Sequence, residues 1–399
     1  MHFANTVFWL LFAASSVVFG RSAELEYSTS IASGILQQES AGKNAKSNPQ
    51  GVRPAGIWFG VKTAPKKKSG TLRIASYNVE KLFDSVVDTA PGARGNNVND
   101  PTTPERLEAL ANAIRELDAD VLCLEEVESK ATLEWFRDKY LSNLDYKYSA
   151  SEDVGCYGGI EQSVLSRVPI KNVKIWPNED LDDMCEKQAS PEEEARLKGE
   201  WASSNSKQKT RFSRSPLMVD LETKDGYAFT VLCVHCKAGA FAHQRELEVL
   251  KIEMFVKARQ KADPKINLVV LGDFNATSND MSVKVLLWSE CTLHNADHWR
   301  ELNRASPDLH ITHASNRAIS FMILTKGMKE DLVPNSYFVL GTLHPADDWD
   351  YKKAKEIPPP PGYASDHYPI AMEIQPKKEG GHHKIPKEFV QDSPRSQKP

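Results

Sequence analysis

Beyond its first twenty residues, this 399-residue sequence lacks any apolar run long enough to suggest a targeting segment or a membrane span. It also lacks a strong net charge. The 50 Lys and Arg residues nearly balance the 54 Asp and Glu residues, and the formal net charge is -4. No basic field therefore covers the whole chain, and any contact with nucleic acid must come from a local patch.

Cysteine is scarce, with six residues in the whole chain. Six cysteines in a sequence of this length do not make a disulfide framework. Cys233 and Cys236 have C-x-x-C spacing, but the two residues between them continue a strand and no further zinc ligands accompany them. Cys156 and Cys185 lie in polar loops and are the candidate pair if the compartment is oxidising.

The apolar block of residues 7–19 ends at Gly20, directly before Arg21. Its length suits a cleaved secretory signal better than a membrane span, although the segment before it carries only His2. We predict a signal peptide over residues 1–20, a secreted or periplasmic protein, and no transmembrane segment after cleavage. An uncleaved anchor is the alternative.

The rest of the chain divides by composition. Residues 21–70 are rich in Ser, Gly, Lys, Pro and Ala and predict a disordered linker, with a contact between residues 57–61 and the domain left open. Residues 71–376 predict one large domain, since the chain is 40% hydrophobic and can bury a large core. Residues 377–399 predict a disordered basic tail. We expect a monomer.

Several apolar runs in the domain are typical of buried strands, and polar side chains follow them directly. The clearest run is residues 268–271. It is followed by Gly272, which can turn the backbone without steric cost. A turn alone explains any one of these positions. Collected together, the strand ends and loop tips supply Asn78, Glu126, His235, Asp273, Asn275, Asp366 and His367.

Carboxylates, amides and imidazoles on one side of a stacked-sheet core are what metal-assisted phosphodiester cleavage requires. Glu125, Glu126 and Glu128 cluster at one strand end, where they repel one another unless a cation or hydrogen-bond donors compensate. Oxygen ligands without thiolates favour Mg²⁺ or Mn²⁺ over zinc. The residues therefore predict a Mg²⁺ or Mn²⁺ site.

The sequence resembles the endonuclease/exonuclease/phosphatase superfamily, which includes deoxyribonuclease I, apurinic endonucleases, neutral sphingomyelinases and inositol phosphatases. The resemblance covers about residues 72 to 375. Each block is weak alone, but six in the family's order are specific. The blocks are SYNVEKLFD, DVLCLEEVE, GGIEQSVLSRVPI, VHCKA, LGDFNAT and SDHYPI.

The resemblance implies an α+β fold of the deoxyribonuclease I type. This is a four-layer αββα sandwich, in which two mainly antiparallel sheets are flanked by helices. It also implies that Asn78 and Glu126 hold the metal ion, with help from Asp366 and Glu80.

The same resemblance assigns the catalytic roles. His235 would contact the phosphate, with Glu161 as its orienting partner. Asp273 and Asn275 would position the attacking water or the intermediate, and His367 would act on the scissile phosphate.

Two positions depart from the family pattern. Glu125 stands where the family usually has Gln, which adds charge. Ser320 stands where the family has an Asp that pairs with the final histidine, so the tautomer of His367 is less well fixed and its cation less favoured. Replacement of the missing carboxylate by a neighbouring one is left open, with the candidates Asp347, Asp348 and Asp350.

The leading hypothesis is a secreted, Mg²⁺- or Mn²⁺-dependent phosphodiesterase that uses water as nucleophile, with a nuclease favoured. A sphingomyelinase- or phosphoinositide-type lipid phosphodiesterase is the first alternative. The GG-x₅-LSRVPI run is compatible with it, but the absence of an obvious apolar membrane-docking stretch favours nucleic acid. The second alternative is a catalytically degenerate module that binds phosphate or nucleic acid, motivated by Ser320.

Overall fold

The computed structural model describes residues 53–86, 101–153, 159–177, 179–182, 210–287, 294–296, 307–347, 349 and 356–377. The chain divides into two compact units, Met1–Arg53 and Pro54–Pro399, and the fold below is that of the second unit. Within the described residues, no helix has both the length and the apolar composition needed to cross a membrane. The predictions that fall outside the described residues concern the signal peptide, Cys156, Cys185, Asp348, Asp350 and residues 378–399.

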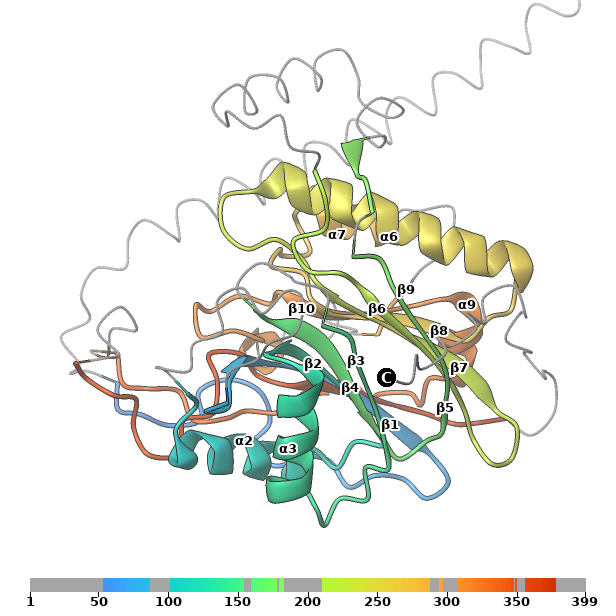
Figure 1. The fold of residues 1–399 in the computed structure, drawn as a ribbon. Coiled ribbons are helices and arrows are strands. Elements are labelled where there is room, and N and C mark those ends of the chain that lie inside the picture. The colour runs from blue at the N-terminus through green and yellow to red at the C-terminus, as the bar shows by residue number, and fades with distance from the viewer. Residues whose placement is uncertain are drawn as a thin grey trace, which may run out of the picture. The chain divides into compact units, whose positions relative to one another are not determined.

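Two sheets form the centre of the second unit (Figure 1). The strands of the first are β1 (Leu72–Leu82), β2 (Val121–Val127), β3 (Tyr148–Ser151), β4 (Glu161–Ser166), β11 (Phe338–Val339) and β12 (Ile370–Ile374). Their order across the sheet is β11-β12-β1-β2-β4-β3. Among these described strands only β1 and β2 pair in parallel, and the other pairs are antiparallel.

The second sheet has the order β5-β6-β7-β8-β10-β9. Its strands are β5 (Ile170–Ile175), β6 (Leu217–Glu222), β7 (Ala228–His235), β8 (Leu268–Asp273), β9 (His294–Asn295) and β10 (Ser320–Leu324). Within the described part of this sheet the single parallel pair is β7 with β8. Strands β6 and β7 form a hairpin, whose turn contains Gly226 at a φ of 83°.

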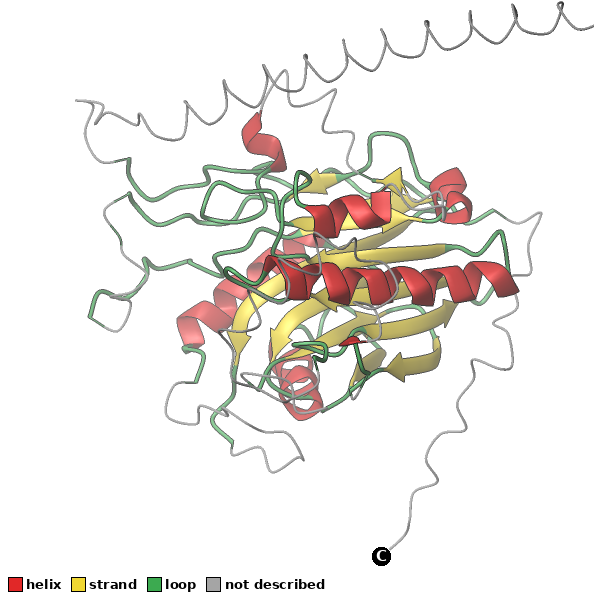
Figure 2. Cartoon of the chain, turned by 90° about the horizontal axis from the view of Figure 1, so that it is seen from above, coloured by secondary structure: helices red, strands yellow, loops and turns green. Residues whose placement is uncertain are grey.

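Helices cover the outer faces of both sheets, as Figures 1 and 2 show. α2 (Pro104–Leu117) and α3 (Lys130–Tyr140) pack on the first sheet through one apolar cluster. α6 (Ala242–Ala262) and α7 (Met281–Leu287) pack on the second through another. The short helices η1 (Pro307–His310) and α9 (Lys326–Asp331) complete the described helices. The predicted α+β four-layer sandwich is confirmed.

A third apolar cluster lies between the two sheets and contains residues from both. Alternate residues of a strand point to the same face of a sheet. Cys233 of β7 and Leu271 of β8 belong to this inner cluster, so the next residues on the same face are His235 and Asp273. The inner face of the sandwich is thus apolar along most of its length and becomes polar at one end.

Local signals in the sequence explain where α2 begins and ends. The Thr103 hydroxyl accepts a hydrogen bond from the Arg106 amide at 3.4 Å, and Pro104 occupies the first turn, where its missing N–H costs nothing. Asp118 ends the helix in a left-handed conformation, with a φ of 45°. Thr103 and Asp118 therefore mark the two ends of α2.

The C-terminal part of the predicted linker is folded, and residues 21–52 of that prediction lie outside the described residues. Residues 54–70 belong to the folded unit, since Gly56 forms an isolated β-bridge with His344 and Val61 forms one with Leu340. The ring of Phe59 is buried in the core between the sheets. Burial of this ring and the two bridges offset the chain entropy that the composition alone would leave unopposed.

Candidate active site

β-bulges turn polar side chains toward the open end of the sandwich. The pairing of β1 with β2 shifts register between Asn78 and Leu82, and β2 shifts against β4 beside Glu126. Glu80 and Glu126 have φ values of 50° and 68°, in the left-handed region. Such a conformation costs a non-glycine residue about 1–3 kcal/mol, so the surrounding structure imposes it. The bulges place both carboxylates at the same end as Asn78.

Gly272 allows β7 and β8 to approach closely beside the site. It lies opposite Val234 in the parallel register and has a φ of 139°. A Cβ atom at this position would overlap the backbone oxygen of Val234. Only glycine therefore fits, and its conformation delivers Asp273 next to His235.

Asp273 is the centre of the polar cluster and is almost fully buried. Its Oδ1 accepts a hydrogen bond from the Asn275 backbone amide at 2.8 Å. Its Oδ2 accepts from the side-chain amides of Asn275 and Asn78, both at 3.1 Å. The Nε2 atoms of His235 and His367 each lie 3.6 Å from Oδ2. Asn275 can make both contacts because Asn tolerates its φ of 49°.

Asn78 joins this carboxylate to a second one. Its side-chain amide also donates to Glu126 Oε1 at 3.1 Å, and its Oδ1 accepts from the Glu80 amide at 3.0 Å. His235 Nε2 lies 3.8 Å from Glu126 Oε1. The side chains of Asn78, Glu126, His235 and Asp273 therefore meet at one place.

The loop before β12 brings Asp366 and His367 to the same place. Ser365 Oγ donates to the Asn78 carbonyl at 2.8 Å and accepts from the His367 amide at 3.1 Å. The Asp366 amide donates to Glu80 Oε2 at 3.1 Å. These bonds fix the loop to the end of β1, and His367 Nε2 lies 3.9 Å from Asp366 Oδ1.

The two histidines have opposite electrostatic surroundings. Burial lowers the pKa of His235 well below its usual value, and the positive charges of Arg214 and His367 lower it further. Burial also opposes a charge on His367, but nearby carboxylates, led by Asp273 and then Asp366, raise its pKa overall. His235 is therefore neutral near pH 7, whereas the cationic form of His367 is favoured.

The acidic groups of the site are crowded. Burial raises the pKa of Glu126, and the charge of Asp366 raises it further. Burial and Asp366 together raise the pKa of Glu80 to about 7. Burial also opposes the charge on Asp366, but His367 and His313 lower its pKa to about 2. Burial raises the pKa of Glu125 well above its usual range, and Ser76 Oγ donates to Glu125 Oε1 at 2.6 Å.

This crowding fits a divalent cation. Glu126 and Glu80 are carboxylates whose ionised forms are disfavoured within the protein alone, and Asp366 adds a third negative group. Carboxylate and amide oxygens of this kind suit Mg²⁺ or Mn²⁺. Asn78, Glu126 and Asp366, with Glu80 beside them, are the residues that could hold the ion.

The predicted contact of Glu161 with His235 is not among the hydrogen bonds and ion pairs of the described residues. Glu161 is buried at the start of β4, opposite Val127 of β2. Both Glu161 and His235 are described, and the structure shows neither a hydrogen bond nor an ion pair between them. Among the described residues His235 Nδ1 has no hydrogen-bond partner. The Nε2 side of the ring faces Glu126 and Asp273, and the orienting role of Glu161 stays a prediction.

Ser320 occupies the inner face of β10, opposite Asp273 of β8. It leaves His367 Nδ1 buried and without a hydrogen-bond partner in the described part of the chain. Asp347 forms no ion pair with His367, while Asp273 and Asp366 do lie beside the His367 ring. Among the described residues, the carboxylates paired with this histidine are those of the site itself.

Two arginines at the site were missed by the sequence analysis. Arg214 Nη1 donates to the Cys236 carbonyl at 3.4 Å, and its charge acts on both His235 and Glu126. Arg106 of α2 donates to the carbonyls of Val79, Glu80 and Ala364, and so ties the β1 bulge to the loop before β12. A single arginine has no periodic sequence signal that marks it as part of a site.

A family model described as the Endonuclease/Exonuclease/phosphatase family matches residues 75–287. This range contains Asn78, Glu126, His235, Asp273 and Asn275, which the fold brings together. The chain belongs to the endonuclease/exonuclease/phosphatase family. Members of this family are generally phosphoesterase hydrolases, and they commonly use divalent metal ions.

This chain is similar in fold to three solved structures. Human Nocturnin, as its catalytic domain, has 16% identity and a TM-score of 0.49, covering 80% of this chain and 98% of its own. Truncated TDP2 from Caenorhabditis elegans has 13% identity and a TM-score of 0.47, covering 77% and 98%. An endonuclease/exonuclease/phosphatase from Bacteroides vulgatus has 13% identity and a TM-score of 0.46, covering 77% and 99%.

Because these identities and TM-scores are low, we draw no functional conclusion from the three structures. Comparison with curated protein sequences gave no significant match.

Proposed function

We propose that this protein is a Mg²⁺- or Mn²⁺-dependent phosphodiesterase that hydrolyses its substrate by direct attack of water, with nucleic acid as the favoured substrate. The observation that carries the proposal is the cluster around Asp273. Three side-chain groups from other elements, those of Asn78, His235 and His367, lie within 3.6 Å of its Oδ2 atom.

The residues have distinct roles in the proposed reaction. Asp273 is held by Asn78 and Asn275 in an orientation that can position a water molecule and accept its proton. His235 is neutral and can donate a hydrogen bond to a phosphoryl oxygen without carrying charge into the site. His367 favours its cationic form, so it can stabilise the negative charge that develops on the phosphate.

A divalent cation, when bound by Asn78, Glu126 and Asp366, would supply neutralisation of phosphate charge and polarisation of the scissile bond. Hydrogen-bond donors from neighbouring residues hold the carboxylates of Glu126 and Glu80. Asn78 donates to Glu126, and Tyr363 donates to Glu80 at 2.6 Å. Their orientation is therefore set before any ion arrives.

Cationic and aromatic groups next to His235 support a nucleic-acid substrate. Arg214 lies close enough to act electrostatically on His235. Lys237 places its ammonium group 4.8 Å from the centre of the Phe241 ring, and that ring is 56% exposed. A cation for the phosphate backbone beside an exposed ring for base stacking is a combination suited to single-stranded nucleic acid.

A substrate panel tests the proposal. Purified protein is incubated with single- and double-stranded DNA, RNA, sphingomyelin and a phosphoinositide, each with Mg²⁺, with Mn²⁺ and with a chelator. We expect cleavage of at least one nucleic acid that depends on the metal and stops on chelation. Cleavage of lipid alone would favour the lipid alternative. Absence of cleavage of every substrate with either metal would refute the phosphodiesterase proposal.

A catalytically degenerate binding module is the second candidate, because Ser320 leaves His367 Nδ1 without a partner among the described residues. We expect Ser320→Asp to raise kcat about tenfold or more, since a carboxylate beside this histidine would orient the ring and favour its cation. Ser320→Asn, which adds a similar volume without charge, is the matched control.

Steady-state rates of the native, Asp and Asn proteins separate the possibilities at Ser320. Cleavage that appears only in the Asp variant would identify the native protein as the degenerate module. Equal rates in all three proteins would contradict the expected gain. They would show instead that Asp273 and Asp366 already supply what His367 needs.

We also propose that the protein is secreted after removal of residues 1–20. The apolar block at residues 7–19 supports this part of the proposal. Expression of the full chain followed by mass spectrometry of the mature N-terminus tests it. Recovery of intact Met1 in cell-associated material alone would contradict it.

A further inference from the structure

A short segment that precedes β10 is bonded to the loop that carries Asp366 and His367. His313 and His367 form an antiparallel β-bridge. The Ala314 amide donates to the Asp366 carbonyl at 2.7 Å, and the Tyr368 amide donates to the Thr312 carbonyl at 2.9 Å. The backbone of this segment therefore holds the loop on which two of the predicted site residues lie.

The side chain of Thr312 fixes the segment from its other side. Its hydroxyl oxygen accepts from the backbone amides of Ile319 and Ser320, at 2.9 and 3.0 Å, and Thr312 is fully buried. Thr312 thus ties the segment to β10 of the second sheet, while Ala314 ties it to the loop that carries Asp366. The backbone at His313 is therefore held by the fold.

The hydrogen bonds of His313 identify its tautomer. Its Nδ1 atom accepts from the Ser315 backbone amide at 2.9 Å, and a backbone N–H can only donate. Ser315 Oγ lies 2.7 Å from the same Nδ1 and accepts from Arg317 Nε at 2.8 Å, so its own hydrogen is free to point to Nδ1. An acceptor Nδ1 leaves the proton of a neutral ring on Nε2.

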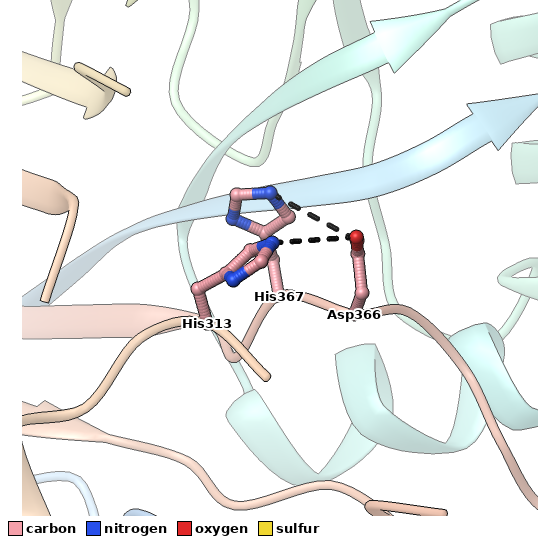
Figure 3. Close-up of side chains that lie close together, drawn as sticks. All are labelled: His313, Asp366 and His367. Atoms are coloured by element: carbon pink, nitrogen blue, oxygen red, sulfur yellow. Dashed lines mark ion pairs between the residues drawn. The ribbon is translucent and has the colours of Figure 1, made fainter. Parts of the chain in front are cut away.

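The protonated Nε2 of His313 faces the site. It lies 3.3 Å from Asp366 Oδ2, within reach for a hydrogen bond to that carboxylate. Figure 3 shows the two imidazole rings close together, with a nitrogen atom of each ring directed toward the Asp366 carboxylate. The ring centres of His313 and His367 are 4.6 Å apart, with an interplanar angle of 76°. This edge-to-face contact restricts rotation of the His367 ring.

These three side chains also lie close enough together to suggest a separate metal site, since one ligand atom from each falls within 4.8 Å of the others. The tautomer argues against His313 as a ligand. A metal-binding histidine normally donates from its second nitrogen, which leaves the coordinating nitrogen without a proton. Here the second nitrogen accepts, so Nε2 carries the proton and cannot offer a lone pair.

We propose that His313 is a positioning residue, which holds the Asp366 carboxylate by donation from Nε2 and holds the His367 ring by edge-to-face packing. This role rests on the proposed phosphodiesterase function. In the family pattern, an Asp at position 320 would orient His367. In the proposed role, His313 supplies part of that orientation through its two contacts. Ser315 and Arg317 fix the tautomer that makes the donation possible.

Two substitutions separate the two contacts. His313→Phe keeps a ring that can pack against His367 but removes the donor to Asp366. His313→Gln keeps an N–H donor of similar reach and removes the ring. Loss of a partner that orients a metal-binding carboxylate typically costs 10–100-fold in metal affinity or activity. Thermal unfolding of each variant checks that the fold is retained.

The first measurement uses the metal-free native protein. A long-range ¹H–¹⁵N spectrum of histidine-labelled protein is expected to show His313 with an unprotonated Nδ1 and a protonated Nε2. The second measurement is Mn²⁺ binding by electron paramagnetic resonance without substrate. We expect His313→Phe to weaken binding about tenfold or more and His313→Gln to restore most of it. In turnover, kcat is expected to fall in His313→Phe with little change in KM.

A proton on Nδ1 of His313, or Mn²⁺ binding and kcat in His313→Phe equal to the native values, would overturn the proposal. Equal losses in both variants, accompanied by a lower melting temperature, would also overturn it by showing a merely structural role. Failure of the proposed function looks different. In that case the native protein cleaves no substrate, while the tautomer and the Mn²⁺ affinities still report on His313.

Discussion

Replacement of Asp273 by asparagine is expected to lower kcat about a thousandfold, because the carboxylate would act as the base for water and as the centre of the hydrogen-bond network. Its Oδ2 atom faces two histidine Nε2 atoms at 3.6 Å, so its charge also favours the cation of His367. Loss of the charge removes both effects at once. Steady-state kinetics on the best substrate of the panel, at saturating metal, measure the change.

The same substitution is also expected to cost stability. The two oxygens of Asp273 accept three hydrogen bonds, from the Asn275 backbone and from the amides of Asn78 and Asn275. An asparagine has one oxygen, so its own NH₂ group must face a donor in either orientation. A buried donor left without an acceptor costs about 1–3 kcal/mol, and urea unfolding is expected to show a loss of this size.

Asp280→Asn is the matched control for Asp273→Asn. Asp280 is an exposed carboxylate that accepts from Thr277 just before α7, and asparagine can serve equally well at such a position. The control is expected to keep both kcat and stability. Native-like kcat in Asp273→Asn would contradict the role assigned to this carboxylate, whatever the control shows.

Replacement of His235 by alanine is expected to reduce kcat by about two to four orders of magnitude. Its Nε2 atom lies between Glu126 and Asp273, at 3.8 and 3.6 Å, at the inner end of β7. Burial keeps the ring neutral, so its contribution is a directed hydrogen bond rather than a charge. His235→Gln retains an N–H donor and is expected to lose less activity than His235→Ala.

His243→Gln provides the histidine control. His243 lies on α6 with its Nδ1 atom 4.0 Å from Glu246, away from the polar cluster around Asp273, and glutamine is a good helix former. Its kcat is expected to remain close to native. If His235→Ala and this control had the same kcat, His235 would not act in the reaction.

The strand ends were predictable because a continuous apolar run in the sequence indicates a buried strand. The run from Leu268 to Leu271 could only be an interior strand, and polar side chains directly after it had to lie at one end of that strand. The same reasoning placed His235 at the end of β7, whereas Asn78 lies at the bulge inside β1, which continues to Leu82. Thr103 and Pro104 are likewise a standard local start signal, and α2 begins there.

Other features had no local signal. Residues 54–70 resemble a linker in composition, and only the burial of Phe59 against the inner core shows that they are folded. Arg106 and Arg214 look like ordinary surface charges until their hydrogen bonds to distant carbonyls are seen. The orienting role of Glu161 toward His235 stays a prediction, since the contacts of the His235 ring in the described residues are those of Nε2 with Glu126 and Asp273.

By itself the sequence determined where the main buried strands lie and which polar residues accompany them, because hydrophobic patterns act over a few neighbouring residues. Only the tertiary structure decided which of these residues meet. The bulge at Glu126, the close approach at Gly272 and the pairing of His313 with His367 join segments far apart in the chain. Side-chain orientation, tautomer and pKa depend on those distant neighbours, and no local pattern encodes them.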